Sequence, residues 1–390
     1  MTLLVTVTGQ DAPGVTAGLL DVLAASGADL VDAEQVVVHG RLLLGLVVAG
    51  DGDGAPVRAA LAAEAQLLGV EVEFTALDDD AQRPPALRHA VTVLGEPLPP
   101  AGFAGVARRL ASCGANIDRV LRVSSWPATS YELVVSGGDT TRLRSELAAE
   151  AVAQQVDVAV EPVTLWRRAR RLVVMDVDST LVQGEVIEML AAEAGCEARV
   201  AEVTAAAMAG ELDFEQSLRA RVALLEGLPV EAVDRVRARV RLTPGARTLV
   251  RTLKRLGHVV GIVSGGFTAV TDDLKATLGL HHALANELEV VDGRLTGRVV
   301  GPVVDRAGKA LALRRFAAAE GMAMEQTVAV GDGANDLDMI EAAGLGIAFN
   351  AKPVVRDAAD TALSVPYLDA VLFLLGIPRE EVEAADAGGE

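Results

Sequence analysis

The stretch LVVMDVDSTLV, residues 172–182, ends an apolar strand on two acids, Asp176 and Asp178. Acids at a strand end face the edge of a sheet, where one carboxylate can attack phosphorus and form an aspartyl-phosphate. A second acid nearby can protonate the leaving oxygen and later deprotonate a water. Two anions that meet an anionic phosphate need compensation, so the stretch predicts a divalent metal site. The plainer alternative is a polar strand end followed by a helix N-cap.

Composition narrows the class of protein. The chain has 390 residues, 51% of them hydrophobic, and a formal net charge of −19. This charge, without a Lys/Arg stripe, argues against nucleic-acid binding. The start of the chain lacks the basic region of a signal peptide, and no apolar run approaches the ~18 residues of a membrane span. Cys113 and Cys196 lie far apart and fit no metal spacing. We therefore expect free thiols, a cytoplasmic protein and no membrane partner.

An internal repeat fills the first 160 residues or so. Similar segments start at Val5 and Val91, and each predicts a strand, a Pro/Gly turn, an amphipathic helix and a second strand. A third strand, a helix and a last strand follow, which gives the ferredoxin-like order β-α-β-β-α-β twice. We expect α+β domains at 1–80 and 86–163, joined by the acidic, Pro-stiffened linker LDDDAQRPP at 77–85.

The pattern changes after this repeat. A strand, a long helical stretch, a strand, a helix, a hairpin, a helix, a strand and a helix are expected between 170 and 378. Such alternation predicts an α/β fold with a doubly wound parallel sheet. The charged helical stretch at about 185–240 is expected to be a cap inserted after the first strand. The acidic end, 379–390, is expected to be a disordered tail.

Two further strand ends carry polar residues. TVAVGDGANDLDM, residues 327–339, predicts a strand that ends at Asp332, followed by Asn335 and Asp336. Oxygen ligands without His or Cys suit Mg²⁺, although a solvated acidic turn has the same composition. VVGIVSGGF, residues 259–267, ends on Ser264 and Gly265, where a hydroxyl and the N–H groups of a helix start can bind phosphate. An ordinary strand-to-helix turn is the alternative there.

One of the four lysines of the chain is a candidate phosphate-binding residue. Lys309 lies near the start of a predicted helix ahead of the strand that ends at Asp332. A lysine there can neutralise a transferring phosphoryl group. A surface lysine is the alternative.

In this order, the motifs resemble the haloacid dehalogenase-like superfamily over residues 170 to about 375. The resemblance implies that Asp176 is the nucleophile and Asp178 the general acid/base. It implies Mg²⁺ held by Asp176, the backbone carbonyl of Asp178, and Asp332, with Asp336 supporting that shell. The phosphate-binding residues implied are Ser264, Gly265 and Lys309, with Asn335 as a nearby polar contact.

A narrower resemblance concerns the cap. DVDSTLVQGEVIEMLA (176–191) followed by MAGELDFEQSLRARVALLEGL (208–228) is similar to the phosphoserine phosphatase family. The resemblance implies hydrolysis of O-phospho-L-serine to L-serine and phosphate. It implies that Glu185 faces the ammonium and carboxylate end of the substrate, that Arg221 holds the carboxylate, and that Met208 and Phe214 close over the ligand. Without the family, Glu185 and Arg221 are ordinary helix-surface charges and Phe214 is a core aromatic.

The two N-terminal repeats resemble ACT domains, small modules that bind amino acids and pair by joining their sheets. The first has Gly14 at the turn before its helix, in DAPG; the second has Gly102, in PPAG, with no acid beside it. The resemblance implies L-serine as a regulator and a homodimer formed through the ACT domains. Modules that serve dimerisation only are the alternative.

Two rival functions stay open at this point. One is the same chemistry on another small phosphomonoester, against which Glu185 and Arg221 argue. The other is a non-enzymatic amino-acid sensor with an inactive phosphatase body. The intact acids Asp176, Asp178 and Asp332 argue against the sensor.

Overall fold

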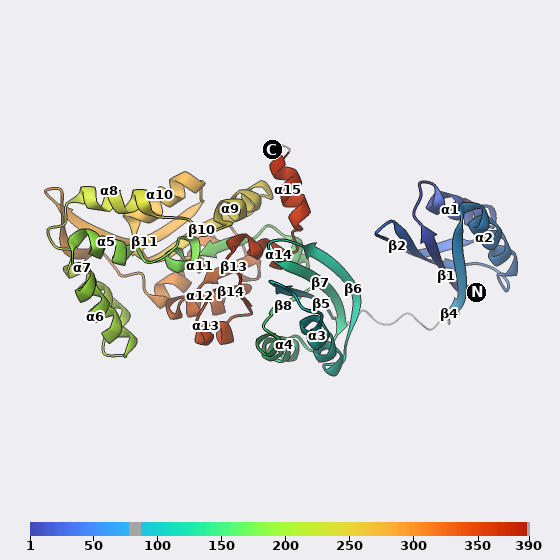
Figure 1. The fold of residues 1–390 in the computed structure, drawn as a ribbon, viewed down its shortest axis with the longest axis horizontal. Helices are drawn as coiled ribbons and strands as arrows, with labels where there is room; N and C mark the ends of the chain where they lie inside the picture. Colours follow the sequence, from blue (N-terminus) through green and yellow to red (C-terminus); the bar gives the residue numbers. More distant parts are fainter. Residues whose placement is uncertain (78–86, 388–390) are drawn as a thin grey trace. The chain divides into compact units, whose positions relative to one another are not determined.

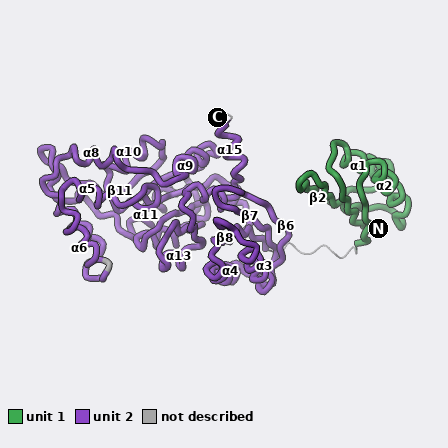
Figure 2. Tube along the Cα trace, in the orientation of Figure 1, with its two compact units in different colours: residues 1–86 green, residues 87–390 purple. Residues whose placement is uncertain are grey.

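The computed structural model of the chain describes residues 1–77 and 87–387, except for the side chain of Met208 (Figure 1). The chain divides into two compact units, residues 1–86 and 87–390 (Figure 2). The first unit holds the first repeat, and the second unit holds the second repeat together with the α/β body. Residues 78–85 of the expected linker lie outside the described residues.

The first unit has the expected ferredoxin-like order. Its sheet is antiparallel in the order β2-β3-β1-β4, and along β1 every second residue, including Leu3, Val5 and Val7, is buried. This period of two is the signature of a strand with one covered face. The elements are β1 (Thr2–Gln10), α1 (Val15–Ala25), β2 (Asp29–Val38), β3 (Arg41–Ala49), α2 (Ala55–Leu68) and β4 (Val70–Leu77).

The second repeat has the same order but different surroundings. Its central strand is buried from His89 to Gly95, on both faces, because the sheet packs on its own helices and on the α/β body. At this junction Thr361 donates a hydrogen bond to the carbonyl of Val158 over 3.0 Å. The elements are β5 (Arg88–Gly95), α3 (Pro100–Ser112), β6 (Ala115–Ser124), β7 (Thr129–Gly137), α4 (Thr140–Gln154) and β8 (Asp157–Pro162), in sheet order β6-β7-β5-β8.

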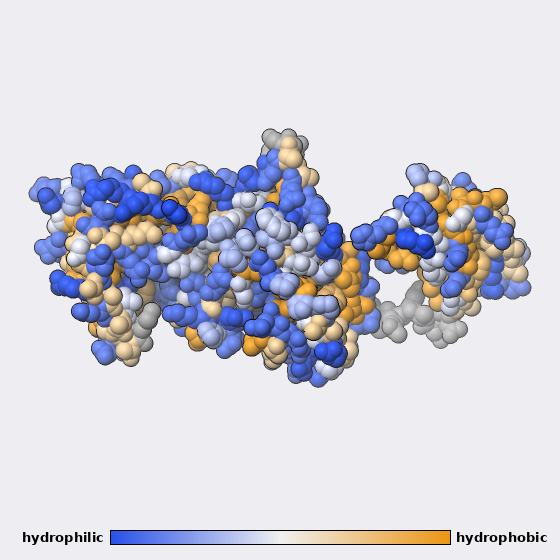
Figure 3. Space-filling model, viewed as in Figure 1, coloured by the Kyte–Doolittle hydropathy of each residue, from blue (hydrophilic) through white to orange (hydrophobic). Residues whose placement is uncertain are grey.

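The edge strands of the two repeats expose apolar side chains. Every residue of β2 is exposed, including Val36, Val37 and Val38. On β6, Val120 and Leu121 are exposed, and Figure 3 shows hydrophobic surface over that strand. An edge strand with exposed apolar residues offers unpaired backbone groups to another chain.

A seven-stranded sheet forms the α/β body, in the order β12-β11-β10-β9-β13-β14-β15. All neighbouring strands are parallel except the hairpin of β11 and β12, as expected for a doubly wound sheet. The short strand β9 is fully buried and lies between β10 and β13. The strands are β9 (Leu172–Met175), β10 (Val259–Phe267), β11 (His282–Val291), β12 (Arg294–Val300), β13 (Thr327–Gly331), β14 (Leu345–Phe349) and β15 (Thr361–Leu363).

Helices cover this sheet and form the cap. The helices of the body are α9 (Ala246–Arg255), α10 (Thr268–Leu278), α11 (Arg306–Ala319), α12 (Leu337–Ala342), α13 (Pro353–Ala358) and α14 (Val371–Leu374). The cap between β9 and β10 consists of α5 (Val186–Ala194), α6 (Glu197–Met208), α7 (Phe214–Ala223) and α8 (Val230–Arg239). Asp213 and Gln216 form a capping box that fixes the start of α7. No helix in the described part of the chain has the length and apolarity needed to cross a bilayer.

The expected disordered tail is wrong for residues 379–387, which form helix α15 (Arg379–Ala387). Val382 is buried, and Arg379 pairs with Asp369 over 2.7 Å. Asp386 pairs with Arg251 and Arg255 of α9. The acidic composition of this segment suggested disorder. Arginines from other segments, such as Arg251 and Arg255, neutralise its acidic side chains, so the segment can fold as a helix. Residues 388–390 lie outside the described residues.

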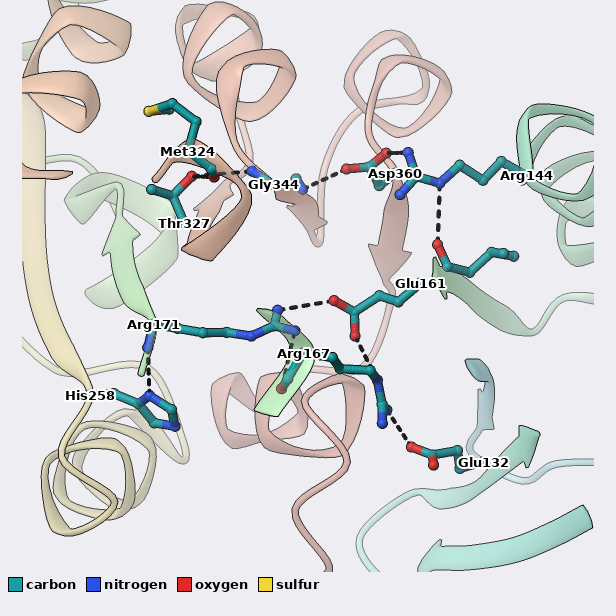
Figure 4. A network of polar contacts seen from close by, with 12 residues as sticks. Glu132, Arg144, Glu161, Arg167, Arg171, His258, Met324, Thr327, Gly344 and Asp360 are labelled. Carbon is teal, nitrogen blue, oxygen red and sulfur yellow. Dashed lines mark hydrogen bonds and ion pairs between the residues drawn. The ribbon is translucent and has the colours of Figure 1, made fainter. Parts of the chain in front are cut away.

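A network of ion pairs joins the second repeat to the body (Figure 4). Arg171, directly before β9, donates from Nη1 to Oε1 of Glu161 on β8 over 2.9 Å. Arg167 bridges Glu161 over 3.2 Å and Glu132 over 2.5 Å. The backbone N–H of Arg171 donates to Nδ1 of His258 over 2.9 Å. The residue that leads into β9 is therefore fixed from both sides.

Candidate active site

The site begins at the carboxyl end of the central strand. Asp176 follows β9, is 3% exposed, and donates its backbone N–H to the carbonyl of Val330 on β13 over 2.8 Å. Asp332 follows β13, so the two acids come from neighbouring parallel strands that end at the same edge. Carboxylate oxygens of Asp176, Asp332 and Asp336 all lie within 4.8 Å of one another. The structure thus brings together acids that are far apart in the sequence.

Lys309 lies among these acids. Its side chain is fully buried, and Nζ lies 2.7 Å from Oδ1 of Asp176 and 2.7 Å from Oδ1 of Asp336. Burial alone would lower the pKa of Lys309, but the charges of Asp176 and Asp336 raise it above its ordinary value. The pKa of Asp176 is raised well above its ordinary value by burial and by the charge of Asp336, against the opposing effect of Lys309. The alternative of a surface lysine is therefore wrong.

Asp178 points toward the end of β10. Its Oδ1 accepts a hydrogen bond from the backbone N–H of Val186 over 2.8 Å, and its Oδ2 accepts one from the hydroxyl of Ser264 over 3.1 Å. Burial raises the pKa of Asp178, and these two hydrogen bonds oppose the shift. A Cβ on Gly266 would lie 2.8 Å from Oδ2 of Asp178, so glycine is needed for this approach. A buried carboxyl with a raised pKa suits a proton donor.

A sharp turn after Asp178 brings the cap back to the site. Ser179 has a φ of 59°, in the left-handed region that few side chains adopt. Its hydroxyl donates to Oε1 of Glu185 over 3.1 Å. Burial and the charge of Asp178 raise the pKa of Glu185 to about 7. A carboxylate in these surroundings is stabilised by a ligand cation such as an ammonium group.

The loop after β13 holds the second set of polar residues. The hydroxyl of Thr180 donates to Oδ1 of Asp332 over 2.9 Å, and the N–H of Gly333 donates to Oδ2 of Asp336 over 3.0 Å. Burial, followed by the charge of Asp336, raises the pKa of Asp332 to about 6. The side chain of Asn335 lies over Gly333. Asp336, which the sequence assigned to a supporting role, is thus itself a member of the carboxylate cluster.

Cap residues approach the same place. A Cβ on Gly265 would lie 2.8 Å from Cζ of Phe214, so the first residue of α7 packs directly on the end of β10. Arg221 forms no ion pair with any described residue, although the charges of Glu185 and Asp178 oppose the fall that burial causes in its pKa. A guanidinium near the site without a carboxylate partner is available to a ligand carboxylate. Met208 ends α6, and its side chain lies outside the described residues.

The two glycines assigned to regulation differ in their surroundings. Gly14 caps α1 with a φ of 97° and has open space beside it. Gly102 lies inside α3, where a Cβ would come within 2.9 Å of Cγ1 of Val156. Val156 therefore occupies the space next to Gly102, while the space next to Gly14 is open.

Sequence reasoning missed several residues that position the site. Asn286 on β11 donates to the carbonyl of Gly265 over 2.8 Å and accepts from the N–H of Val304, which fixes the end of β10. Thr243 donates to the carbonyl of Thr180 over 2.6 Å. The sequence could have indicated Thr180, because this residue closely follows Asp176 and Asp178. It could not have indicated Asn286 and Thr243, because they act only through contacts between distant segments.

The charges of the site fit a divalent cation. Within the described part of the chain, the carboxylates of Asp176, Asp178, Glu185, Asp332 and Asp336 interact with two cationic side chains, Lys309 and Arg221. A phosphate ester would bring further negative charge. A cluster of carboxylate oxygens without His or Cys is a donor set for a hard metal ion.

Comparisons with known proteins agree with this geometry. The family model of haloacid dehalogenase-like hydrolases matches residues 173–341, and ACT domain models match residues 1–75 and 88–161. A phosphoserine phosphatase of Streptomyces coelicolor is 61% identical over 387 residues, which is 99% of this chain and 94% of the relative. Phosphoserine phosphatase SerB2 of Mycobacterium tuberculosis is 54% identical over 394 residues, which is 100% of this chain and 96% of the relative.

A solved structure of a substrate-bound phosphoserine phosphatase complex is also similar to this chain. It is 46% identical, with a TM-score of 0.51, and the match covers 53% of this chain and 98% of that one. The relatives match this chain over nearly its full length, through both repeats as well as the body. The chain therefore belongs to the phosphoserine phosphatases, hydrolases of the haloacid dehalogenase-like family, and carries two ACT domains ahead of its catalytic domain.

Proposed function

We propose that this enzyme hydrolyses O-phospho-L-serine to L-serine and phosphate through an aspartyl-phosphate on Asp176, with Mg²⁺ as its cofactor. The observation that carries the proposal is the position of Asp176. It lies at the end of the central strand with one oxygen held by the buried Lys309 and with two further acids within 4.8 Å. The similarity to a substrate-bound phosphoserine phosphatase supports the choice of substrate.

In the first half of the reaction, the oxygen of Asp176 that Lys309 does not hold attacks phosphorus. The bond from phosphorus to the serine oxygen breaks, and Asp178 donates its proton to that leaving oxygen. The raised pKa of Asp178 supports this role, because a buried carboxyl keeps its proton at a higher pH. Ser264 bonds the other side of the same carboxyl and orients it.

In the second half, Asp178 acts as a base. It takes a proton from water, the water oxygen bonds to phosphorus, and the bond from phosphorus to Asp176 breaks. Phosphate leaves, and Asp176 is regenerated as a carboxylate. Ser264, Gly265 and Lys309 bind the phosphate throughout, and Asn335 adds a polar contact.

The residues that would hold Mg²⁺ are Asp176, Asp332 and the backbone carbonyl of Asp178. When bound, the ion supplies positive charge between these carboxylates and the phosphate. Asp336 is tied to Lys309 over 2.7 Å and to the N–H of Gly333, so it holds the lysine beside Asp176.

The cap residues account for the amino-acid part of the substrate. Glu185 faces the ammonium group and Arg221 holds the carboxylate as a two-pronged donor. Phe214 and Met208 close over the ligand. The absence of an ion pair on Arg221 among the described residues supports this assignment.

Phosphate release tests the proposal. O-phospho-L-serine should be hydrolysed with Mg²⁺ and not after chelation of the metal, and Ca²⁺ should inhibit because its looser coordination can engage both oxygens of Asp176. O-phosphoethanolamine, which lacks the carboxylate, and a sugar phosphate should be turned over far more slowly. Arg221→Gln should raise KM for O-phospho-L-serine selectively, with Arg315→Gln, an exposed arginine on α11, as the matched control. Equal turnover of all three esters would overturn the substrate assignment.

We also propose that the enzyme is a cytoplasmic homodimer that pairs through its ACT domains and responds to L-serine. The exposed apolar residues of the edge strands β2 and β6 support pairing, and the two free cysteines suit a reducing compartment. Light scattering after size exclusion should give the mass of two chains. Replacing Val36 and Val38 by lysine should lower that mass if β2 is part of the contact.

A further inference from the structure

A cavity lies where the second ACT domain meets the catalytic domain. Its volume is about 460 Å³, and residues from β5, the end of α4, α13 and the segment after β15 line it. None of the residues assigned to catalysis or substrate binding is among them. The lining residues used below are Glu96, Val156, Asp157, Arg356, Ser364 and Val365.

Opposite charges without partners line this cavity. Arg356 on α13 is half-buried, and its guanidinium makes no hydrogen bond or ion pair with a described residue. Glu96, in the loop after β5, likewise has no partner in residues 1–77 and 87–387. Asp157 lies close enough to Arg356 for the guanidinium charge to oppose the rise that burial causes in the pKa of its carboxyl, and its two oxygens accept from the N–H of Ser364 over 2.7 Å and from its hydroxyl over 2.9 Å. The unpaired groups are therefore one guanidinium and one exposed carboxylate.

We propose that this cavity binds a free α-amino acid, whose carboxylate pairs with Arg356 and whose ammonium group pairs with Glu96. Arginine presents a rigid fork of donors that matches a carboxylate. Val156 and Val365 are apolar members of the lining, so we expect the side chain of the ligand to be small and uncharged. The proposal rests on the proposed function only for the choice of L-serine as the probe.

A ligand here would contact the segment that supports the catalytic loop. Ser364 and Val365 lead to Leu368, whose N–H donates to the carbonyl of Pro244 over 2.8 Å. The next residue back, Thr243, bonds the carbonyl of Thr180, and the hydroxyl of Thr180 bonds Asp332. The chain segment 364–368 and these hydrogen bonds thus connect the cavity wall with a proposed metal ligand, so we expect an amino acid bound in the cavity to alter the support of Asp332.

Calorimetric titration of the full-length protein with L-serine tests the site. The active site also binds serine as a product, so the variants separate the two. Arg221→Gln should weaken the binding of L-serine at the active site and leave its binding in the cavity unchanged. Arg356→Gln should weaken binding in the cavity by roughly tenfold or more, the effect of losing one hydrogen bond to a charged group. Arg315→Gln, on the same domain and equally without a partner among the described residues, should bind L-serine like the unaltered chain.

Probes with one charge identify the partners. Glycolate lacks the ammonium group and ethanolamine lacks the carboxylate, so each should bind the cavity more weakly than L-serine. Glu96→Gln should weaken the binding of L-serine but not the binding of glycolate. Glu96 is exposed and unpartnered, so this variant keeps the test valid if Arg356→Gln fails to fold.

The outcomes are distinct. Loss of one class of serine site in both Arg356→Gln and Glu96→Gln, with Arg315→Gln unchanged, supports the proposal. Serine binding that is equal in Arg356→Gln, Glu96→Gln and Arg315→Gln overturns it, and so does a binding stoichiometry that falls to zero in Arg221→Gln. Phosphate release from O-phospho-L-serine is measured separately, so a failure of the proposed function would be seen there and not in the titration.

Discussion

Arg171 and Glu161 form a buried ion pair, 2.9 Å long, between the second ACT domain and the residue that leads into β9. The side chains are 5% and 10% exposed. Since Asp176 directly follows β9, the strand that leads to the proposed nucleophile is anchored directly to the second ACT domain. Removing one partner of such a pair leaves a buried charge without compensation.

We expect Glu161→Leu to lower the free energy of unfolding by about 3–5 kcal/mol, because it strips both Arg171 and Arg167 of a carboxylate. Urea denaturation measures this loss. Glu215→Leu is the control, because its pair with Arg219 is solvent-exposed and is expected to contribute less than about 1 kcal/mol. Equal effects of the two substitutions would show that the buried pair contributes little.

Acid should weaken the same junction through His258. Burial, followed by the charges of Arg171 and Arg170, lowers the pKa of His258 below 6.5, and its Nδ1 must stay unprotonated to accept from Arg171. Protonation therefore favours the unfolded chain, so the contribution of His258 is complete above pH 6.5 and is lost as the pH falls below it. In His258→Asn, which keeps an acceptor that does not titrate, stability should fall less between pH 7.5 and 5.5. Urea denaturation of both chains at each pH measures the difference.

Asp176→Asn should abolish phosphate release without unfolding the protein. The amide oxygen can still accept from Lys309, and the repulsion between Asp176 and Asp336 disappears. Phosphate release and thermal unfolding measured on the same sample check both parts. A variant that retained much of its activity would remove Asp176 from the role of nucleophile.

Lys309→Met should lower the free energy of unfolding more than Asp176→Asn does. It leaves Asp176 and Asp336 close together with no lysine between them, and we expect a loss of about 3–5 kcal/mol together with loss of activity. Lys275→Met on α10 is the control, since its ammonium group makes no hydrogen bond or ion pair with a described residue. Normal stability of Lys309→Met would show that the buried lysine contributes little to the fold.

Gly265→Ala should raise KM by roughly tenfold, the effect of losing about 1.4 kcal/mol of binding. The added Cβ would displace Phe214, which lies 2.8 Å away, and so hold the cap open. Gly45→Ala is the control, because its Cβ would meet only Leu4, at 3.9 Å. Phe214→Leu in the Gly265→Ala background restores the space for the added Cβ, so KM should fall again. If KM stays high in the double variant, the contact with Phe214 is not the cause.

The sequence was sufficient wherever a pattern is local. The period of two along the strands and the repeat from Val5 and Val91 predicted both ferredoxin-like units, and acids after two apolar strands predicted the meeting of Asp176 with Asp332. It failed where a residue acts through tertiary contacts. Nothing in the sequence indicated that Asn286 holds Gly265, or that arginines of α9 would neutralise the acidic end of the chain and turn it into α15.

The cap enters and leaves the sheet between β9 and β10, which are hydrogen-bonded neighbours. Its length and sequence can therefore vary without altering the register between β9 and β10. In the proposed assignment, the residues that select the substrate lie mainly in the cap, and the residues that break the bond lie at the strand ends. An engineer who wants a new phosphomonoester substrate should therefore change Glu185 and the side chains of α5 to α8 that face the site, and leave the strand ends untouched.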